Sequence, residues 1–238
     1  MTKAYFLVAH GSRDPRPQLA LEQIAEQLCI LPYHTTSPII GTGILECSPL
    51  YLSQQLQQFA DKIRPYRMTQ IQILPLFLLP GVHVKEDIPV EVAIAQQILG
   101  SDITLNVLPY LGYHVEKIAA LLTQQMQLLS PDTWILMAHG SRRQGGNRPI
   151  EILAQQLGIT PAYWSVSPHL SEQINTLIQQ GSTHIGVLPY FLFTGGITDA
   201  ITQLLQDYSQ QFTDVKFSLA QPLDQTSVLT ELAQMALF

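Results

Sequence analysis

Apolar residues occur along this chain in short, nearly continuous runs that are separated by amphipathic segments. In the first half the runs cover residues 5–9, 39–45, 70–78 and 103–108. Runs of this length, rich in Ile, Val, Leu and Phe, are typical of parallel strands buried on both faces. The segments between them have helical spacing and cover residues 17–29, 49–63, 89–99 and 113–128. This alternation predicts an α/β fold, a parallel sheet with helices on both faces.

The second half of the chain repeats the first. The sequence His-Gly-Ser-Arg ends an apolar run at His10 and again at His139. "CSPLYLSQQL" (47–56) is matched by "VSPHLSEQI" (166–174), and "ILPLFLLPGVHV" (73–84) by "VLPYFLFTGGIT" (187–198). Apolar runs recur at 133–138, 162–166, 184–191 and 215–219. A period of more than 100 residues indicates a duplicated domain and not a solenoid. We therefore expect two similar lobes, residues 1–129 and 130–238, joined by the turn-like "LLSPDT" at 128–133.

Composition excludes several classes of protein. The 238 residues are 46% apolar, enough for a sizeable core, and no apolar run approaches the roughly 18 residues of a membrane helix. A net charge of −6 without a basic run argues against nucleic-acid binding. Two cysteines cannot form a Cys-rich zinc or iron–sulfur site. Since the first apolar run has no cleavage region after it, we expect a cytoplasmic protein without a signal peptide.

Three chemically active side chains follow successive strands of the first half. His10 comes after the first strand, Glu46 after the second and His83 after the third. Because ligands bind beyond the carboxyl ends of parallel strands, these side chains are expected at one edge of the sheet. Two imidazoles and a carboxylate suit a divalent ion such as Fe²⁺, Co²⁺, Ni²⁺ or Zn²⁺. They can equally accept protons near neutral pH.

The second half keeps only part of this set. His139 matches His10, but Ser165 stands opposite Glu46 and Ile197 opposite His83. The difference predicts one active centre, in the N-terminal lobe, and a C-terminal lobe that serves as a wall or holds the substrate. Glu86 and Asp87, ahead of Pro89, are interpreted as acids of a helix start.

Arginines gather beside the two His-Gly-Ser loops of an otherwise acidic chain. Arg13 follows the first loop, and Arg142, Arg143 and Arg148 lie in or after the second. Guanidinium groups bind carboxylates in a bidentate manner, so these four residues are candidates for holding an anionic substrate. A solvated surface loop is the alternative interpretation. The sequence has no phosphate-binding G-x-x-x-x-G-K-[ST] loop and no G-x-S-x-G nucleophile elbow.

The segments "LVAHGSRDPRP", "GILECSP" and "LPLFLLPGVHVKEDIPVEV" together resemble the class II tetrapyrrole chelatases, in particular the sirohydrochlorin cobaltochelatases and ferrochelatases. The resemblance extends along essentially the whole chain. It implies two chelatase-like lobes facing across a cleft and ATP-independent insertion of Co²⁺ or Fe²⁺ into sirohydrochlorin, for cobalamin or siroheme biosynthesis. It also implies that His10, His83 and Glu46 bind the metal and act in catalysis. The metal is then a substrate, and no tightly bound cofactor is expected.

Two other functions stay open at this stage. The same residues could belong to a carrier that binds metal or tetrapyrrole without catalysis, or to a zinc-dependent lyase or hydrolase. The sequence does not distinguish Co²⁺ from Fe²⁺ or Ni²⁺ as the physiological metal, because imidazole–carboxylate sites are permissive. The duplication lets one chain supply two lobes, and we expect a monomer.

Overall fold

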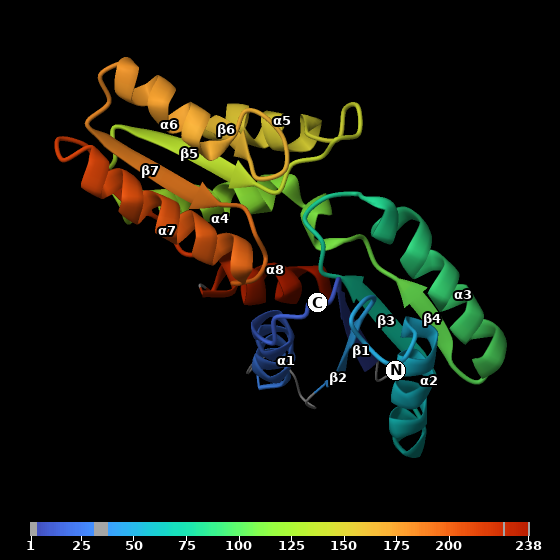
Figure 1. Cartoon of the computed structure of the whole chain (residues 1–238). Helices are drawn as coiled ribbons and strands as arrows, with labels where there is room; N and C mark the ends of the chain where they lie inside the picture. The colour runs from blue at the N-terminus through green and yellow to red at the C-terminus, as the bar shows by residue number, and fades with distance from the viewer. Residues whose placement is uncertain (1–3, 31–37, 226, 238) are drawn as a thin grey trace. The chain divides into compact units, whose positions relative to one another are not determined.

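The computed structural model describes residues 4–30, 38–225 and 227–237 and contains two four-stranded parallel sheets (Figure 1). The first sheet has the order β2-β1-β3-β4 and the second β6-β5-β7-β8. The strands of the first sheet are β1 (Ala4–Ala9), β2 (Ile39–Ile44), β3 (Gln70–Pro75) and β4 (Thr104–Val107). Those of the second are β5 (Thr133–Ala138), β6 (Thr160–Tyr163), β7 (His184–Pro189) and β8 (Lys216–Leu219).

Helices lie on both faces of each sheet, as the alternation of patterns predicted (Figure 1). In the first half they are α1 (Arg16–Cys29), α2 (Leu52–Ile63), α3 (Ile88–Leu99) and α4 (Val115–Gln127). In the second half they are α5 (Arg148–Leu157), α6 (Leu170–Gln179), α7 (Gly196–Gln211) and α8 (Val228–Leu237). None of the helices within the described ranges is long and apolar enough to span a membrane.

Alternate residues of the central strands form the two cores. Phe6 and Val8 of β1 pack with side chains of α2 and α3, and Phe6 lies 5.1 Å from the Phe59 ring between centroids. In the second sheet, Ile135 and Met137 of β5 pack with α6 and α7. Every residue of β1 is buried, which explains why its sequence is continuously apolar and does not alternate.

The internal repeat is visible in the hydrogen bonds at the strand ends. Glu46 N donates to His10 O (2.8 Å), and Ser165 N donates to His139 O (2.9 Å). Leu76 N donates to Val8 O, and Tyr190 N donates to Met137 O in the same way. The offsets of 165 − 46 = 119 and 190 − 76 = 114 are those of the sequence repeat, so the duplication predicted from the motifs is present in the backbone.

Two strands differ most from the sequence prediction. The expected run 70–78 ends as a strand at Pro75, because Phe77 N turns back to Pro75 O (3.1 Å) and the chain leaves the sheet. The expected run 162–166 is displaced toward its start and forms β6 from Thr160 to Tyr163. Apolar content alone does not mark the residue at which a chain leaves its sheet.

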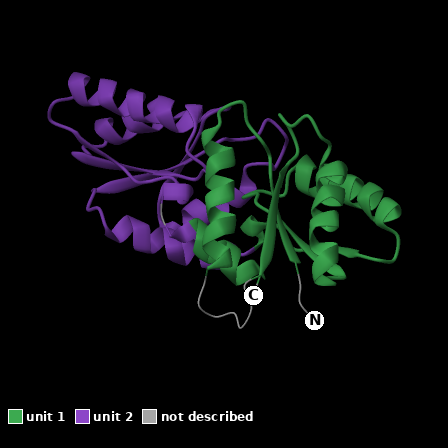
Figure 2. Ribbon diagram, turned by 90° about the horizontal axis from the view of Figure 1, so that it is seen from below, with its two compact units in different colours: residues 1–113, 229–238 green, residues 114–228 purple. Residues whose placement is uncertain are grey.

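The chain divides into two compact units (Figure 2). Unit 1 consists of residues 1–113 and 229–238, and unit 2 of residues 114–228. Helix α4, the last helix of the first half, therefore belongs to unit 2, and most of α8, the last helix of the chain, belongs to unit 1. The units accordingly have different boundaries from the sequence halves 1–129 and 130–238.

Candidate metal centre

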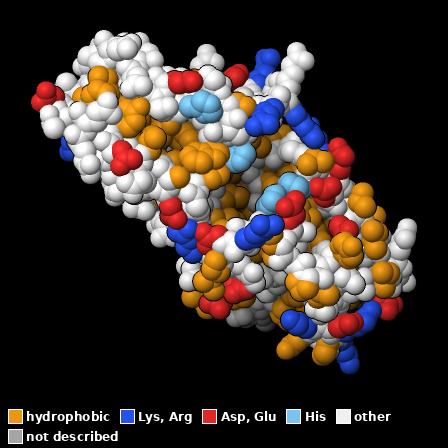
Figure 3. All heavy atoms as spheres, viewed as in Figure 1, with side chains coloured by type: hydrophobic (Ala, Val, Ile, Leu, Met, Phe, Trp, Pro, Cys, Tyr) orange, Lys and Arg blue, Asp and Glu red, His pale blue; other side chains and the backbone are white. Residues whose placement is uncertain are grey.

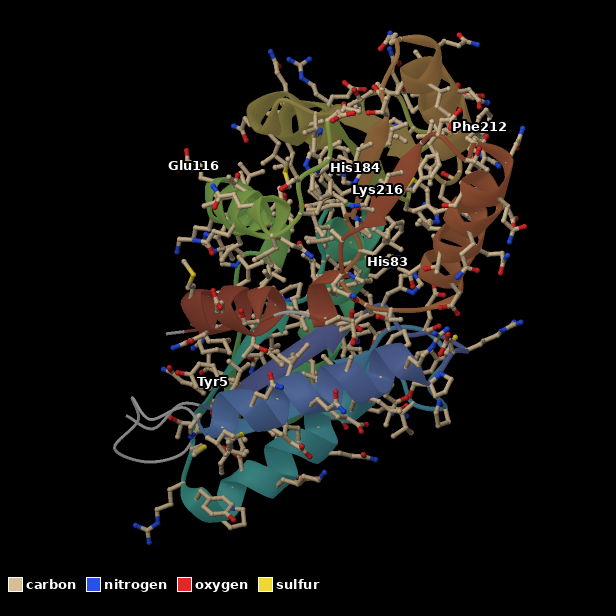
Figure 4. The ribbon with its side chains drawn as sticks, turned by 90° about the vertical axis from the view of Figure 1, so that its left-hand side faces the viewer. Tyr5, His83, Glu116, His184, Phe212 and Lys216 are labelled. Carbon is tan, nitrogen blue, oxygen red and sulfur yellow. The ribbon has the colours of Figure 1, made fainter. Side chains whose placement is uncertain are left out.

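Three strand ends of unit 1 bring His10, Glu46 and His83 together. β1 ends directly before His10, and β2 ends two residues before Glu46. Leu45 N donates to Ala9 O and Glu46 N to His10 O, which extends the β1–β2 ladder beyond the strands and holds Glu46 beside His10. His83, labelled in Figure 4, begins a single π-helical turn, His83–Asp87, that precedes α3.

The three side chains converge at their polar atoms. One ligand atom from each lies within 4.8 Å of those of the other two. His10 Nε2 is 3.8 Å from Glu46 Oε1, and the two imidazole rings meet edge to face with centroids 4.6 Å apart. Ligands that bind one ion at about 2.0–2.2 Å lie roughly 3–4 Å from one another. Small side-chain rotations would therefore bring all three to a single divalent ion.

The site is open to solvent. The side chains of His10 and Glu46 are 49% and 55% exposed, and that of His83 is 25% exposed. Figure 3 shows imidazole groups at the molecular surface beside acidic side chains. Three ligands on a surface leave coordination positions free for a substrate, as in catalytic metal sites and unlike closed structural ones.

Each imidazole has a partner at Nδ1. His10 Nδ1 lies 3.0 Å from Gly11 O, and His83 Nδ1 lies 2.7 Å from Asp87 Oδ2. A proton on Nδ1 that is donated to these oxygens leaves the Nε2 lone pair free to bind a metal. The sequence interpretation took Asp87 as a helix-start acid and missed its contact with His83. The spacing of four residues from His83, on one side of a helical turn, was the signal that could have indicated it.

The backbone around Glu46 is tightly held. The Gln55 side chain bonds both the N–H and the carbonyl of Ile44, at 3.0 and 2.8 Å, and also reaches Leu50 O at 2.9 Å. Gly11 has φ +95°, and a Cβ atom there would overlap the backbone carbonyl of Glu46. The glycine of the first His-Gly-Ser motif therefore permits the close approach that places Glu46 beside His10.

Unit 2 has the same scaffold without the ligand set. His139 Nδ1 lies 3.1 Å from Gly140 O, as His10 does from Gly11 O, but Ser165 and Ile197 occupy the positions of Glu46 and His83. Within the described residues, His10, Glu46 and His83 form the one group of three or more that could hold an ion.

The four candidate arginines lie in both units, and all are exposed. Arg13 is in unit 1 beside Arg16, whose guanidinium group binds Asp14 with contacts of 2.6–3.1 Å. Arg142, Arg143 and Arg148 are in unit 2. Their loop is ordered by Asn147, which accepts from Ser141 N (2.7 Å) and donates to Ser141 O (3.2 Å).

A pocket of about 230 Å³ lies elsewhere in unit 2. Residues of α6, α7 and the end of β6 line it, among them Trp164, Leu170 and Leu204. It contains none of the seven candidate residues, and its wall is mainly apolar. The candidate metal ligands therefore do not line this pocket and lie at the open sheet edge of unit 1.

Comparison with known proteins gives consistent matches along the chain. The family model named CbiX matches residues 4–128 and again 133–237. A sirohydrochlorin ferrochelatase of Priestia megaterium is 30% identical over 237 residues, covering 88% of this chain and 81% of the relative. A sirohydrochlorin cobaltochelatase of the same organism is 23% identical over 235 residues, covering 92% and 73%.

Solved structures share the fold. The structure of SirB from Bacillus subtilis with Fe³⁺ matches with a TM-score of 0.76 at 20% identity, covering 99% of this chain and 94% of that one. The structure of the sirohydrochlorin chelatase SirB from Bacillus subtilis subspecies spizizenii in complex with cobalt gives a TM-score of 0.72 at 22% identity.

Proposed function

Because this chain belongs to the CbiX family, we propose that it is a sirohydrochlorin chelatase, a lyase that inserts Co²⁺ or Fe²⁺ into sirohydrochlorin without ATP. The observation that carries the proposal is the convergence of His10, Glu46 and His83 within 4.8 Å at an open sheet edge. The relatives are named for cobalt and for iron, and imidazole–carboxylate sites accept both, so both ions are candidate substrates.

In this proposal the three residues hold the metal and receive protons. Each of two pyrrole N–H bonds breaks heterolytically, the electron pair stays on nitrogen to form the bond to the metal, and the proton passes to a base. No electron is transferred. His10, His83 and Glu46 can each serve as this base, an imidazole once its Nε2 lone pair has left the metal. A three-ligand site also releases its ion more readily than a closed four-ligand one.

The arginines extend the proposal to substrate binding. Sirohydrochlorin is a polycarboxylate, and guanidinium groups bind carboxylates with two parallel hydrogen bonds. Arg13 in unit 1 and Arg142, Arg143 and Arg148 in unit 2 are exposed, as such a role requires. In this scheme the sequence half 1–129 supplies the catalytic groups and 130–238 a substrate-binding wall. A cytoplasmic location and a monomeric state are further parts of the proposal.

An anaerobic insertion assay tests the activity. Metal-free sirohydrochlorin is mixed with Co²⁺ or Fe²⁺ and the protein, and the change in ring absorption is followed. We expect His10→Ala, His83→Ala and Glu46→Gln each to lower the rate by roughly 100-fold or more, as for loss of a general base. The matched control is His139→Ala, which removes the equivalent imidazole of unit 2 and should leave most of the rate.

Two outcomes would contradict the proposal. A wild-type rate equal to the uncatalysed background, with Co²⁺ still bound, would make the chain a carrier. Equal losses from His10→Ala and His139→Ala would show that the residues of both repeats take part, against the single centre inferred from Ser165 and Ile197.

A further inference from the structure

The two histidines of the metal centre differ in what they contact at Nδ1. His83 meets a carboxylate, Asp87 Oδ2, at 2.7 Å, whereas His10 meets a neutral backbone carbonyl, Gly11 O, at 3.0 Å. A carboxylate partner fixes the tautomer and the ring orientation of a metal-binding imidazole and makes it a stronger donor than a carbonyl partner does. The two imidazoles are therefore unequal ligands.

Other contacts also restrain His83 more than His10. The Phe77 ring lies 5.9 Å from the His83 ring between centroids, in addition to the edge-to-face contact of His83 with the His10 ring. The His83 side chain is 25% exposed, about half the value for His10. Asp87 thus completes a setting in which the His83 ring is held at Nδ1 and by neighbouring rings, beside His10 and Glu46.

The π-helical turn explains how His83 and Asp87 meet. Residues His83–Asp87 form a single π-helical turn, and Ile88 N donates to His83 O across it. Such turns inside or beside α-helices occur frequently at functional sites. The turn places the two side chains of residues 83 and 87 on the same side, directly before α3.

The second repeat lacks both members of the pair. Ile88 at the start of α3 and Ile201 in α7 are the corresponding core residues, with Val92 and Leu205 one turn later, an offset of 113. His83 and Ile197 are instead offset by 114, so Asp87 corresponds to Ala200 or Ile201, and neither residue carries a carboxylate. The acid in the first turn of α7 is Asp199, at a different position, so an acid at the position of Asp87 occurs only in the copy that has the histidine.

We propose that Asp87 is a positioning residue that fixes His83, through Nδ1, as the anchoring metal ligand, while His10 is the ligand that yields the ion to the substrate. The inference rests on the proposed function of the site. Asp87 acts through His83 and contacts neither the metal nor the tetrapyrrole.

Binding of Co²⁺ alone tests the role of Asp87. The Co²⁺ affinity and the visible spectrum of bound Co²⁺ are measured for the full chain and for Asp87→Ala, Asp87→Asn and Asp87→Glu. We expect Asp87→Ala to lower the affinity about 10–100-fold, as is usual when a partner of a ligating histidine is lost. Asp87→Asn keeps the shape of the side chain and so controls for misfolding, and we expect it to lower Co²⁺ affinity as well. Asp87→Glu restores the carboxylate and should recover part of the lost affinity.

Glu86→Gln is the matched control. Glu86 is the exposed neighbouring acid, so its neutralisation changes the net charge equally without removing the bond to His83. We expect its Co²⁺ affinity to stay within about twofold of wild type, since charges at an exposed site are screened.

A double-mutant cycle separates positioning from a structural role. In the His83→Ala background, Asp87→Ala should have no further effect on Co²⁺ affinity, because residues that act through one contact are not additive. Additive losses, or an unchanged affinity in Asp87→Ala, would overturn the inference. The cycle needs no tetrapyrrole. If Co²⁺ affinity depends on Asp87 and His83 as expected but the wild-type chain fails the insertion assay, the proposed activity is contradicted and the positioning role of Asp87 is not.

Discussion

At the scale of single residues, a close backbone contact of Gly11 helps to place Glu46 beside His10. Gly11 has φ +95°, in the left-handed region that favours glycine, and it packs directly against the backbone of Glu46. A side chain at residue 11 would both strain the turn and push Glu46 away from His10. Gly158 in unit 2 also has a left-handed backbone, with φ +68° and ψ +31°, but open space surrounds its Cβ position.

Gly11→Ala and Gly158→Ala therefore form a useful pair. For Gly158→Ala we expect only the left-handed penalty of about 1–2 kcal/mol in the free energy of unfolding. Gly11→Ala should cost more than that and should also lower Co²⁺ affinity, because Glu46 is displaced. Urea unfolding and Co²⁺ titration measure the two effects. Unchanged Co²⁺ affinity in a folded Gly11→Ala variant would show that the Gly11–Glu46 contact does not position the carboxylate.

Three of the four side chains at the site could be predicted from the sequence. His10, Glu46 and His83 were identifiable because each follows a recognisable strand, and parallel strands present their carboxyl ends at one edge. Asp87 was not, because an acid ahead of a proline-containing helix start already has a sufficient local explanation. The π-helical turn places the Asp87 carboxylate 2.7 Å from His83 Nδ1, and the four-residue spacing was the sequence signal of this contact.

At the scale of elements, strand β6 ends in a buried residue with an unsatisfied group. Tyr163 is 3% exposed, and its hydroxyl has no hydrogen-bond partner among the residues that the structure describes. Burial, with a smaller contribution from the negative charge of Glu151, raises the pKa of Tyr163 to about 12. An unpaired buried hydroxyl costs free energy that an apolar ring of the same shape does not.

Tyr163→Phe should consequently stabilise the protein by about 1 kcal/mol at neutral pH. The pH dependence has a definite sign. A tyrosine with a raised folded-state pKa keeps its proton in the folded chain while the unfolded chain loses it. Wild-type stability should therefore fall as pH rises from the unfolded pKa of about 10 toward about 12. The variant should lose less stability over this range, as measured by urea unfolding at several pH values.

Tyr66→Phe is the control for this comparison, because the ring of Tyr66 is 66% exposed. Its free energy of unfolding should stay within about 0.5 kcal/mol of wild type. Destabilisation by Tyr163→Phe at neutral pH would mean that the hydroxyl is satisfied in solution, by an ordered water for example.

At the scale of the whole molecule, the two repeats exchange their last helices. Leu122 of α4 is fully buried in unit 2, although α4 closes the first repeat. Leu232 of α8 is 1% exposed in unit 1, where Thr230 Oγ1 lies 2.7 Å from Gln27 Oε1 of α1. The repeat in the motifs predicted two lobes but not this exchange. An amphipathic pattern shows that a helix face must be buried, not which sheet it is buried against.

The exchange predicts that each terminal helix stabilises the unit built mainly from the other repeat. Leu232→Ala should cost about 2–5 kcal/mol, as for other buried leucines, and should speed amide hydrogen exchange chiefly in β1 and β3 of unit 1. Leu122→Ala, of equal chemistry and burial, should act chiefly on β5 and β7 of unit 2. The reverse assignment would contradict the division into units. Equal acceleration in both sheets would show that the chain unfolds as one cooperative body, in which α8 supports the metal centre only through global stability.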